Sequence, residues 1–331
     1  MQAVVITGPR ALEIAELPDP TPKPGEVVIE VAASGICGTD LQIFAGDYPA
    51  ALPVVPGHEF AGTVVALGRD VHDLRVGNRV AADPNIPCWR CPYCRDGRVN
   101  LCDNYAALGV TMNGASARYL ALPEYLCVRV PESLDIHHAA LAEPLSCALH
   151  AWDLVGPQVG RSAVIYGSGT MGLMMLQVGR LFGIPAVDVV DINPAKLEAA
   201  STLGAGRLVT DAAQAMPDGG WDVVIDASGS AAAIADGLTR VAKGGTFLQF
   251  GVAPPEVRVE IDPFDIYERE IRILGAVCPL NSFARSLELL AIGAVNPVPL
   301  VSDTFALEDY RAALEKFASG DTRKILVSAG A

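Results

Sequence analysis

Four cysteines lie within one short stretch of the chain. Their spacing is Cys88-x2-Cys91-x2-Cys94-x7-Cys102. Such spacings let a single loop wrap a metal ion, and four thiolates close a tetrahedral zinc site with no open position. The pattern predicts a structural zinc site. A disulfide pair and an iron–sulfur cluster are the alternatives, and a chain that looks cytoplasmic disfavours both.

A second set of possible metal ligands is dispersed. Cys37 lies in GICGTD, His58 and Glu59 lie in PGHEFAG, and Glu143 lies in LAEPLSCALH. A thiolate, an imidazole and a carboxylate form a mixed ligand set with room for water or substrate, which is typical of catalytic zinc. No spacing rule joins residues so far apart. The alternative that Cys37 is a core thiol and His58 a structural histidine therefore stays open.

A glycine-rich segment matches G-x-G-x-x-G, the pattern of a dinucleotide-binding turn. It follows the apolar run SAVIY and precedes a helical pattern, and Asp191 comes nineteen residues after its last glycine. An acidic residue at that distance accepts hydrogen bonds from the adenosine ribose and would repel a 2′-phosphate, which favours NAD. A structural turn beside a solvated Asp191 is the alternative. The candidate cofactor residues are Gly167, Gly169, Thr170, Met171, Gly172, Asp191, Lys196 and Gly251. For Lys196, a solvated helix charge is an equal alternative.

The elements that must position these residues follow two patterns. Up to about residue 144, short β-branched runs such as VVIEVAA and FAGTVVAL are bounded by Gly and Pro, which predicts an antiparallel, partly closed β domain. Beyond it, apolar strands such as WDVVIDASG alternate with helical stretches such as SAAAIADGLTRVAKG. This alternation predicts a doubly wound parallel sheet, so the fold class is α/β. The tail, ALEDYRAALEKFASG and KILVSAG, predicts one helix and one strand.

Composition limits the classes of function. The 331 residues carry a formal charge of −14, with 51% hydrophobic and 19% charged residues. The acidic balance disfavours nucleic-acid or anionic-membrane partners, and the low charged fraction argues against disorder. Neither a basic-then-apolar leader nor a spanning apolar stretch is visible. We therefore expect a cytoplasmic protein that acts on a small molecule.

Taken together, the motifs resemble the zinc-dependent medium-chain dehydrogenases. The matching segments are GICGTD, PGHEFAGTV, the four-cysteine lobe, AEPLSCALHA, and GSGTMG with its later Asp, and they cover nearly the whole chain in order. Within that family, the sequence most resembles the polyol (sorbitol-type) and threonine dehydrogenase branch, because it has Glu in the AEPLS segment.

The resemblance implies a GroES-like, β-rich catalytic domain interrupted by a Rossmann domain, with the active site between them. The implied boundaries are 1–145 for the catalytic domain (zinc lobe about 84–105), 146–281 for the NAD-binding domain and 282–331 for a C-terminal return. It also implies a homodimer or homotetramer.

The resemblance also implies the chemistry. Cys37 and His58 would bind a catalytic zinc ion, and of Glu59 and Glu143 one would bind it while the other holds water or a substrate hydroxyl. Zinc would act as a Lewis acid on an alcohol oxygen, Thr39 would relay the proton, and NAD would take the hydride. A capping hydroxyl is the alternative for Thr39.

The implied substrate is a secondary alcohol of a polyol or sugar-like molecule, oxidised to a ketone. L-Threonine and sugar-alcohol phosphates are the alternatives within the enzyme class. A non-catalytic NAD-binding relative is the alternative outside it, and retention of the zinc ligands argues against that.

Two departures from the family pattern leave the substrate open. Gln42 stands where many relatives have a histidine, and Cys278-Pro279 occupies the region of the Arg-Tyr pair of sorbitol dehydrogenases. Phe44 and Tyr48 are candidate pocket residues, with simple packing as their alternative.

Overall fold

The computed structural model describes residues 1–328, and these form two compact units. One unit comprises residues 1–146 together with the segment that begins at Leu280, and the other comprises Cys147–Pro279. The chain therefore leaves the first unit, builds the second and returns. Residues 329–331, which include the last two residues of the predicted KILVSAG strand, lie outside the described part.

The first unit is built on a seven-stranded sheet. Its main path runs β16–β17–β3–β4–β5–β9, and β8 also pairs with β3. The strands are β3 (Glu26–Ile36), β4 (Glu59–Leu67), β5 (Arg79–Ala82), β8 (Tyr119–Pro123), β9 (Cys127–Arg129), β16 (Val301–Ala306) and β17 (Lys324–Ser328). All pairs are antiparallel except β16 with β17, which is parallel. This parallel pair lies in the tail, beyond the stretch up to about residue 144 for which the sequence predicted an antiparallel domain. A helix connects its two strands and lets the chain re-enter in the same direction.

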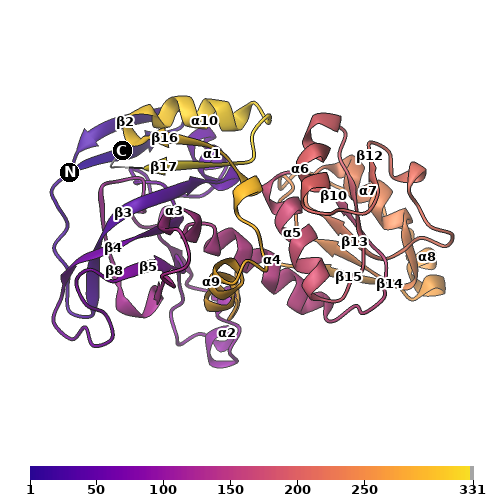
Figure 1. Ribbon diagram of the computed structural model, residues 1–331, viewed down its shortest axis with the longest axis horizontal. Coiled ribbons are helices and arrows are strands. Elements are labelled where there is room, and N and C mark those ends of the chain that lie inside the picture. The colour runs from indigo at the N-terminus through magenta and orange to yellow at the C-terminus, as the bar shows by residue number, and fades with distance from the viewer. Residues whose placement is uncertain (329–331) are drawn as a thin grey trace. The chain divides into compact units, whose positions relative to one another are not determined.

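The tail completes that sheet. It contributes β16, the crossing helix α10 (Tyr310–Ala318) and β17, where the sequence predicted one helix and one strand. In Figure 1, β17 lies beside β3 although almost 300 residues separate them. The buried side chains of Ile36, Tyr310 and Ile325 pack in one cluster there. Burial of these apolar groups fixes the tail on the sheet.

Shorter elements surround this sheet. They are the hairpin β1 (Gln2–Gly8) and β2 (Ala11–Glu16), helices α1 (Gly38–Ala45), α3 (Ile136–Ala139) and α9 (Phe283–Ala291), and a lobe of β6 (Asn85–Ile86), α2 (Pro92–Arg95) and β7 (Ala106–Ala107). Helix α4 (Ala142–Val155) carries the chain out of the unit. Two buried serine hydroxyls join α9 to α4, because Ser286 donates to the carbonyl of Ala142 and Ser282 to that of Ser146.

The second unit is a six-stranded parallel sheet in the order β12–β11–β10–β13–β14–β15. The strands are β10 (Ala163–Tyr166), β11 (Val187–Val190), β12 (Leu208–Val209), β13 (Trp221–Asp226), β14 (Val241–Gln249) and β15 (Arg272–Gly275). The helices are α5 (Thr170–Leu181), α6 (Leu197–Thr202), α7 (Ala231–Thr239) and α8 (Pro263–Arg269). This strand order is that of the doubly wound dinucleotide-binding fold, as predicted.

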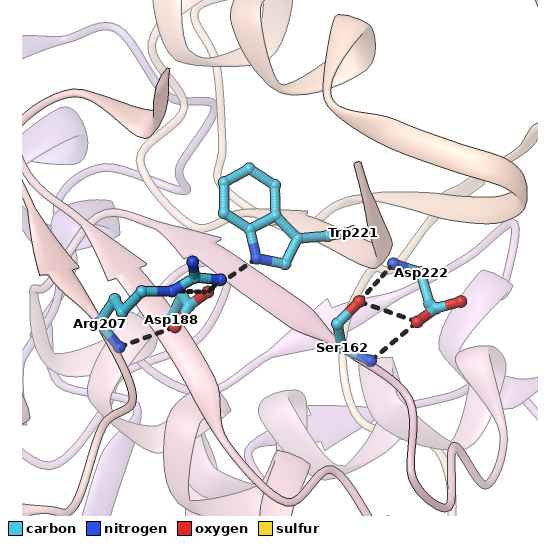
Figure 2. Close-up of polar contacts among 5 residues, drawn as sticks. All are labelled: Ser162, Asp188, Arg207, Trp221 and Asp222. Atoms are coloured by element: carbon cyan, nitrogen blue, oxygen red, sulfur yellow. Dashed lines mark hydrogen bonds and ion pairs between the residues drawn. The ribbon is translucent and has the colours of Figure 1, made fainter. Parts of the chain in front are cut away.

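One buried carboxylate joins three strands of this sheet. Asp188 on β11 accepts hydrogen bonds from the indole of Trp221 at 2.8 Å and from the guanidinium of Arg207 at 2.9 Å (Figure 2). Trp221, which starts β13, is fully buried. The backbone N–H and Nε of Arg207 also donate to Asp188, which therefore satisfies four donors and fixes β12 and β13 relative to β11.

Candidate functional site

Cys37 lies where the central strand β3 ends and α1 begins. Its backbone N–H donates to the Asp40 carboxylate at 2.8 Å, and the N–H of Gly57 donates to the other oxygen of that carboxylate at 3.3 Å. Asp40 is fully buried, which raises its pKa above the ordinary value of 3.8. A single carboxylate thus joins the loop of Cys37 to the loop of His58.

The structure brings three of the predicted catalytic ligands together. Ligand atoms of Cys37, His58 and Glu59 all lie within 4.8 Å of one another. Protein ligands surround zinc at about 2.0–2.3 Å, so a set of this size fits one ion. Within the described residues, the buried Nδ1 of His58 has no hydrogen-bond partner. An imidazole, a thiol and a carboxyl group placed this way fit a zinc ion.

The charges around His58 favour its protonated form when no metal is bound. Burial opposes protonation, but the neighbouring Asp40, whose carboxylate lies 3.8 Å from Nδ1, and Cys37 raise the pKa of His58 well above its ordinary value of 6.5. A zinc ion would need the neutral imidazole, so it competes with that proton.

Glu143 lies in the first turn of α4 and is buried in the same unit. The pKa of its carboxyl group is raised to about 7, chiefly by burial; the charge of His58 opposes this rise and that of Glu59 adds to it. Glu143 is therefore close enough for the charges of His58 and Glu59 to affect its pKa. It is not part of the group of ligand atoms that lies within 4.8 Å.

Glu59 is held by a cation from the returning tail. The Lys324 ammonium lies 2.6 Å from the Glu59 carboxylate and also donates to the carbonyl of Ile36 at 3.0 Å. Glycine at position 35 makes room for this arrangement, because a Cβ there would lie 2.1 Å from a carboxylate oxygen of Glu59. In the sheet order β17–β3–β4, the strands that carry Lys324 and Glu59 flank β3, and the two side chains meet beside it.

The other predicted residues of this site have weaker geometric support. The Thr39 hydroxyl lies 3.9 Å from the Cys37 sulfur, and its role as a proton relay stays a prediction. Phe44 packs among apolar side chains below the guanidinium of Arg311, and Tyr48 is 40% exposed. The role of Phe44 and Tyr48 in substrate binding stays a prediction.

The four clustered cysteines converge on one point in the lobe. Their sulfur atoms all lie within 4.8 Å of one another, with Cys91 and Cys102 at 3.9 Å. Tetrahedral zinc with bonds of about 2.3 Å requires sulfur atoms about 3.8 Å apart. Backbone N–H groups point at the sulfurs, and hydrogen bonds to Cys88, the largest from the N–H of Arg90, lower its pKa to about 6. The lobe therefore fits a zinc ion held by Cys88, Cys91, Cys94 and Cys102.

The glycine-rich turn joins β10 to α5 in the second unit. A Cβ at position 172 would lie 1.8 Å from the carbonyl oxygen of Gly167, so only glycine allows this helix to start so close to the strand. Gly169 is the N-cap of α5, and Thr170 and Met171 form its first turn. The N-terminus of the helix presents its backbone N–H groups at the carboxyl edge of the sheet, where parallel folds bind pyrophosphate.

Asp191 follows β11 and contacts this turn. Its carboxylate accepts the N–H of Ser168 at 2.8 Å and that of Asn193 at 2.9 Å. Lys196 contacts the turn through its backbone carbonyl, which accepts the Ser168 hydroxyl. Gly251 follows β14 at the same edge, where its N–H donates to the carbonyl of Asp226.

Comparisons with known proteins agree with this architecture. The model of the alcohol dehydrogenase GroES-like domain matches residues 23–132, and that of the zinc-binding dehydrogenase matches residues 170–291. A sorbitol dehydrogenase of Bacillus subtilis is 34% identical over 96% of this chain and 93% of its own length. D-arabinitol dehydrogenase 1 of Uromyces fabae is 32% identical over 99% and 97%. A Sinorhizobium meliloti protein whose crystal structure holds NADP superposes with a TM-score of 0.95 at 35% identity, covering 99% of this chain and 98% of that one.

The chain therefore belongs to the zinc-binding alcohol dehydrogenase family, with a GroES-like domain and a Rossmann-like domain. It is an oxidoreductase that uses zinc and a nicotinamide dinucleotide. In the described part of the chain, no helix is long and apolar enough to span a membrane.

Sequence reasoning missed two residues that organise the candidate metal site. Asp40 could have been found, because an acidic residue three positions after Cys37 at the start of a helix commonly accepts backbone N–H groups. Lys324 carried no such signal, since nothing in KILVSAG relates it to Glu59.

Proposed function

We propose that this protein oxidises a secondary alcohol of a polyol or sugar-like substrate to the ketone, with NAD as the hydride acceptor. The observation that carries the proposal is the convergence of Cys37, His58 and Glu59 on one point. The polyol dehydrogenases among the relatives support the substrate class.

In this proposal Cys37, His58 and Glu59 hold the catalytic zinc ion, and Glu143 is the alternative carboxylate ligand. When bound, the ion supplies Lewis acidity to an alcohol oxygen. Asp40 orients the loops of Cys37 and His58, and outer partners of this kind tune the ligands. The Thr39 hydroxyl accepts the alcohol proton and passes it toward solvent. Glu143, buried and with a raised pKa, holds water or a substrate hydroxyl.

The proposed cofactor site takes the pyrophosphate at the N-terminus of α5 and the adenosine ribose at Asp191. A carboxylate there accepts ribose hydroxyls and repels a 2′-phosphate. NAD is therefore the proposed cofactor, although one similar protein binds NADP. Lys196 and Gly251 are further candidates for this site.

A substrate panel tests the proposal. Sorbitol, arabitol, xylitol and L-threonine are each offered with NAD, and NADH formation is followed by absorbance. Turnover of one or more polyols with little turnover of threonine is the expected result. Preferential turnover of threonine would instead favour the threonine dehydrogenase alternative, and the same panel with phosphorylated polyols tests the sugar-alcohol phosphate alternative.

We further propose that the protein is a cytoplasmic homo-oligomer, a dimer or a tetramer. Large apolar side chains lie exposed around α8 and the edge strand β15, among them Phe264, Tyr267, Ile273 and Val277. Apolar groups gathered in this way mark interaction surfaces. Light scattering tests this, since a mass equal to the 34.6 kDa chain would contradict it. The gathered thiols of the lobe suit a reducing compartment.

A further inference from the structure

A polar cavity opens in the second unit at the edge of the sheet opposite the glycine-rich turn. Its volume is about 430 Å³, and its lining includes Arg161, Asp222, Lys243, Thr246 and Arg272. Arg161 precedes β10, Asp222 is near the start of β13, and Arg272 is the first residue of β15. Amino ends of parallel strands share one edge, whereas the cofactor turn follows their carboxyl ends. The cavity is therefore separate from the proposed cofactor site.

Cations outnumber acids in this lining. Asp222 is its one carboxylate, and it already accepts the backbone N–H and hydroxyl of Ser162, at 2.9 Å and 2.8 Å, and the guanidinium of Arg161 at 3.1 Å. Figure 2 shows the Ser162–Asp222 contacts. Asp222 thus compensates Arg161 and leaves two cations uncompensated. Such a local excess is notable in a chain whose formal charge is −14.

The two remaining cations, Arg272 and Lys243, differ in how the surrounding structure holds them. Nε and Nη2 of Arg272 both donate to the hydroxyl of Thr246, at 3.1 Å and 2.7 Å, and Thr246 is buried. This contact fixes the guanidinium plane and leaves Nη1 for a ligand. Lys243 lies in a bulge of β14, where the register with β13 jumps from Trp221↔Val241 to Val223↔Thr246. Within the described residues Lys243 makes no ion pair, so its ammonium is available.

We propose that this cavity is a second ligand site that binds a phosphate group. An oriented guanidinium and a mobile ammonium are the pair that proteins use for phosphate, because one supplies directed N–H donors and the other a point charge. The volume is within the range of small-molecule sites, while the polar lining fits an anion better than an apolar body. Free inorganic phosphate and the phosphate monoester of a small metabolite share this chemistry.

Titration of the intact protein tests the site. Inorganic phosphate and glycerol 3-phosphate are each titrated by calorimetry at constant ionic strength, with and without saturating NADH. We expect saturable binding of about one phosphate per chain that NADH leaves unchanged. A lower Kd for the ester identifies a metabolite as the source, and equal Kd values identify free phosphate.

Matched variants distinguish specific binding in the cavity from nonspecific attraction of phosphate by positive charge. Lys243→Gln/Arg272→Gln should weaken phosphate binding by about tenfold or more, since it removes both uncompensated cations. Lys23→Gln/Arg69→Gln makes the same change of charge on exposed residues of the first unit and should leave the Kd unchanged. NADH binding by the variant shows that its second unit is folded. If the double variant does not fold, the single variant Lys243→Gln is titrated in its place. Absence of saturable binding, competition by NADH, or equal weakening in both double variants would overturn the proposal.

Discussion

The ammonium group of Lys324 lies 2.6 Å from the carboxylate of Glu59, and both side chains are almost completely buried. The pair joins the returning tail to the first residue of β4 beside the candidate metal ligands. In the folded protein the tail is therefore part of the site, because it supplies the cation that balances one of the ligands.

Replacement of this lysine should destabilise the protein strongly. Lys324→Met leaves the buried Glu59 carboxylate without its cation, and removal of one partner from a buried ion pair costs about 3–5 kcal/mol. Lys316→Met is the matched control, because Lys316 pairs with Asp303 while 47% exposed, and exposed pairs contribute about 0–1 kcal/mol. Denaturant unfolding of the zinc-free proteins measures both. Equal losses of unfolding free energy in the two variants would show that the buried Lys324–Glu59 pair stabilises the protein no more than the exposed pair does.

Zinc binding at the catalytic site should release protons near neutral pH. The pKa of His58 is raised well above 6.5, which favours the protonated imidazole in the metal-free protein, whereas zinc requires the neutral form. The contribution of His58 to this release is full below its raised pKa and disappears as the pH rises through it. The protein is first stripped of its exchangeable zinc ion, and zinc is then titrated back by calorimetry in buffers of different ionisation enthalpy. The dependence of the heat on the buffer gives the number of protons released per zinc ion. A heat of binding that is independent of the buffer at pH 7 would rule this out.

The lobe should hold a zinc ion that is independent of catalysis. Elemental analysis should find about two zinc ions per chain, and Cys94→Ser should lose about one of them together with part of the stability. Cys127→Ser, a thiol outside both ligand sets, should keep both ions. If wild type and Cys94→Ser contain the same amount of zinc, the lobe is not a zinc site.

Asp191 should determine the cofactor preference. Asp191→Ala removes the charge that repels a 2′-phosphate, so the ratio of kcat/KM for NAD to that for NADP should fall by about tenfold. Asp218→Ala removes an exposed carboxylate of the same unit and should not change the ratio. An unchanged ratio in Asp191→Ala would assign Asp191 only to holding the turn through Ser168.

The sequence predicted the parts of the site that depend on local spacing. The cysteines of the lobe and the glycines of the turn are close in the chain, so their geometry follows from a loop or a strand–helix junction. The Lys324–Glu59 pair spans 265 residues and depends on the registers of β17 and β4 with β3, which no local pattern encodes. The parallel β16–β17 pair escaped prediction for the same reason, because strand direction depends on the crossover of α10.

The central claim is that Cys37 and its neighbours hold the zinc ion at which an alcohol is oxidised. The most direct measurement is the rate of NADH formation from NAD and a polyol, in wild type and in Cys37→Ser, each assayed with zinc and after chelation. The account predicts that wild type loses activity on chelation and regains it with zinc, whereas Cys37→Ser binds NADH normally but has almost no activity in either condition. Activity of Cys37→Ser close to that of wild type would contradict it.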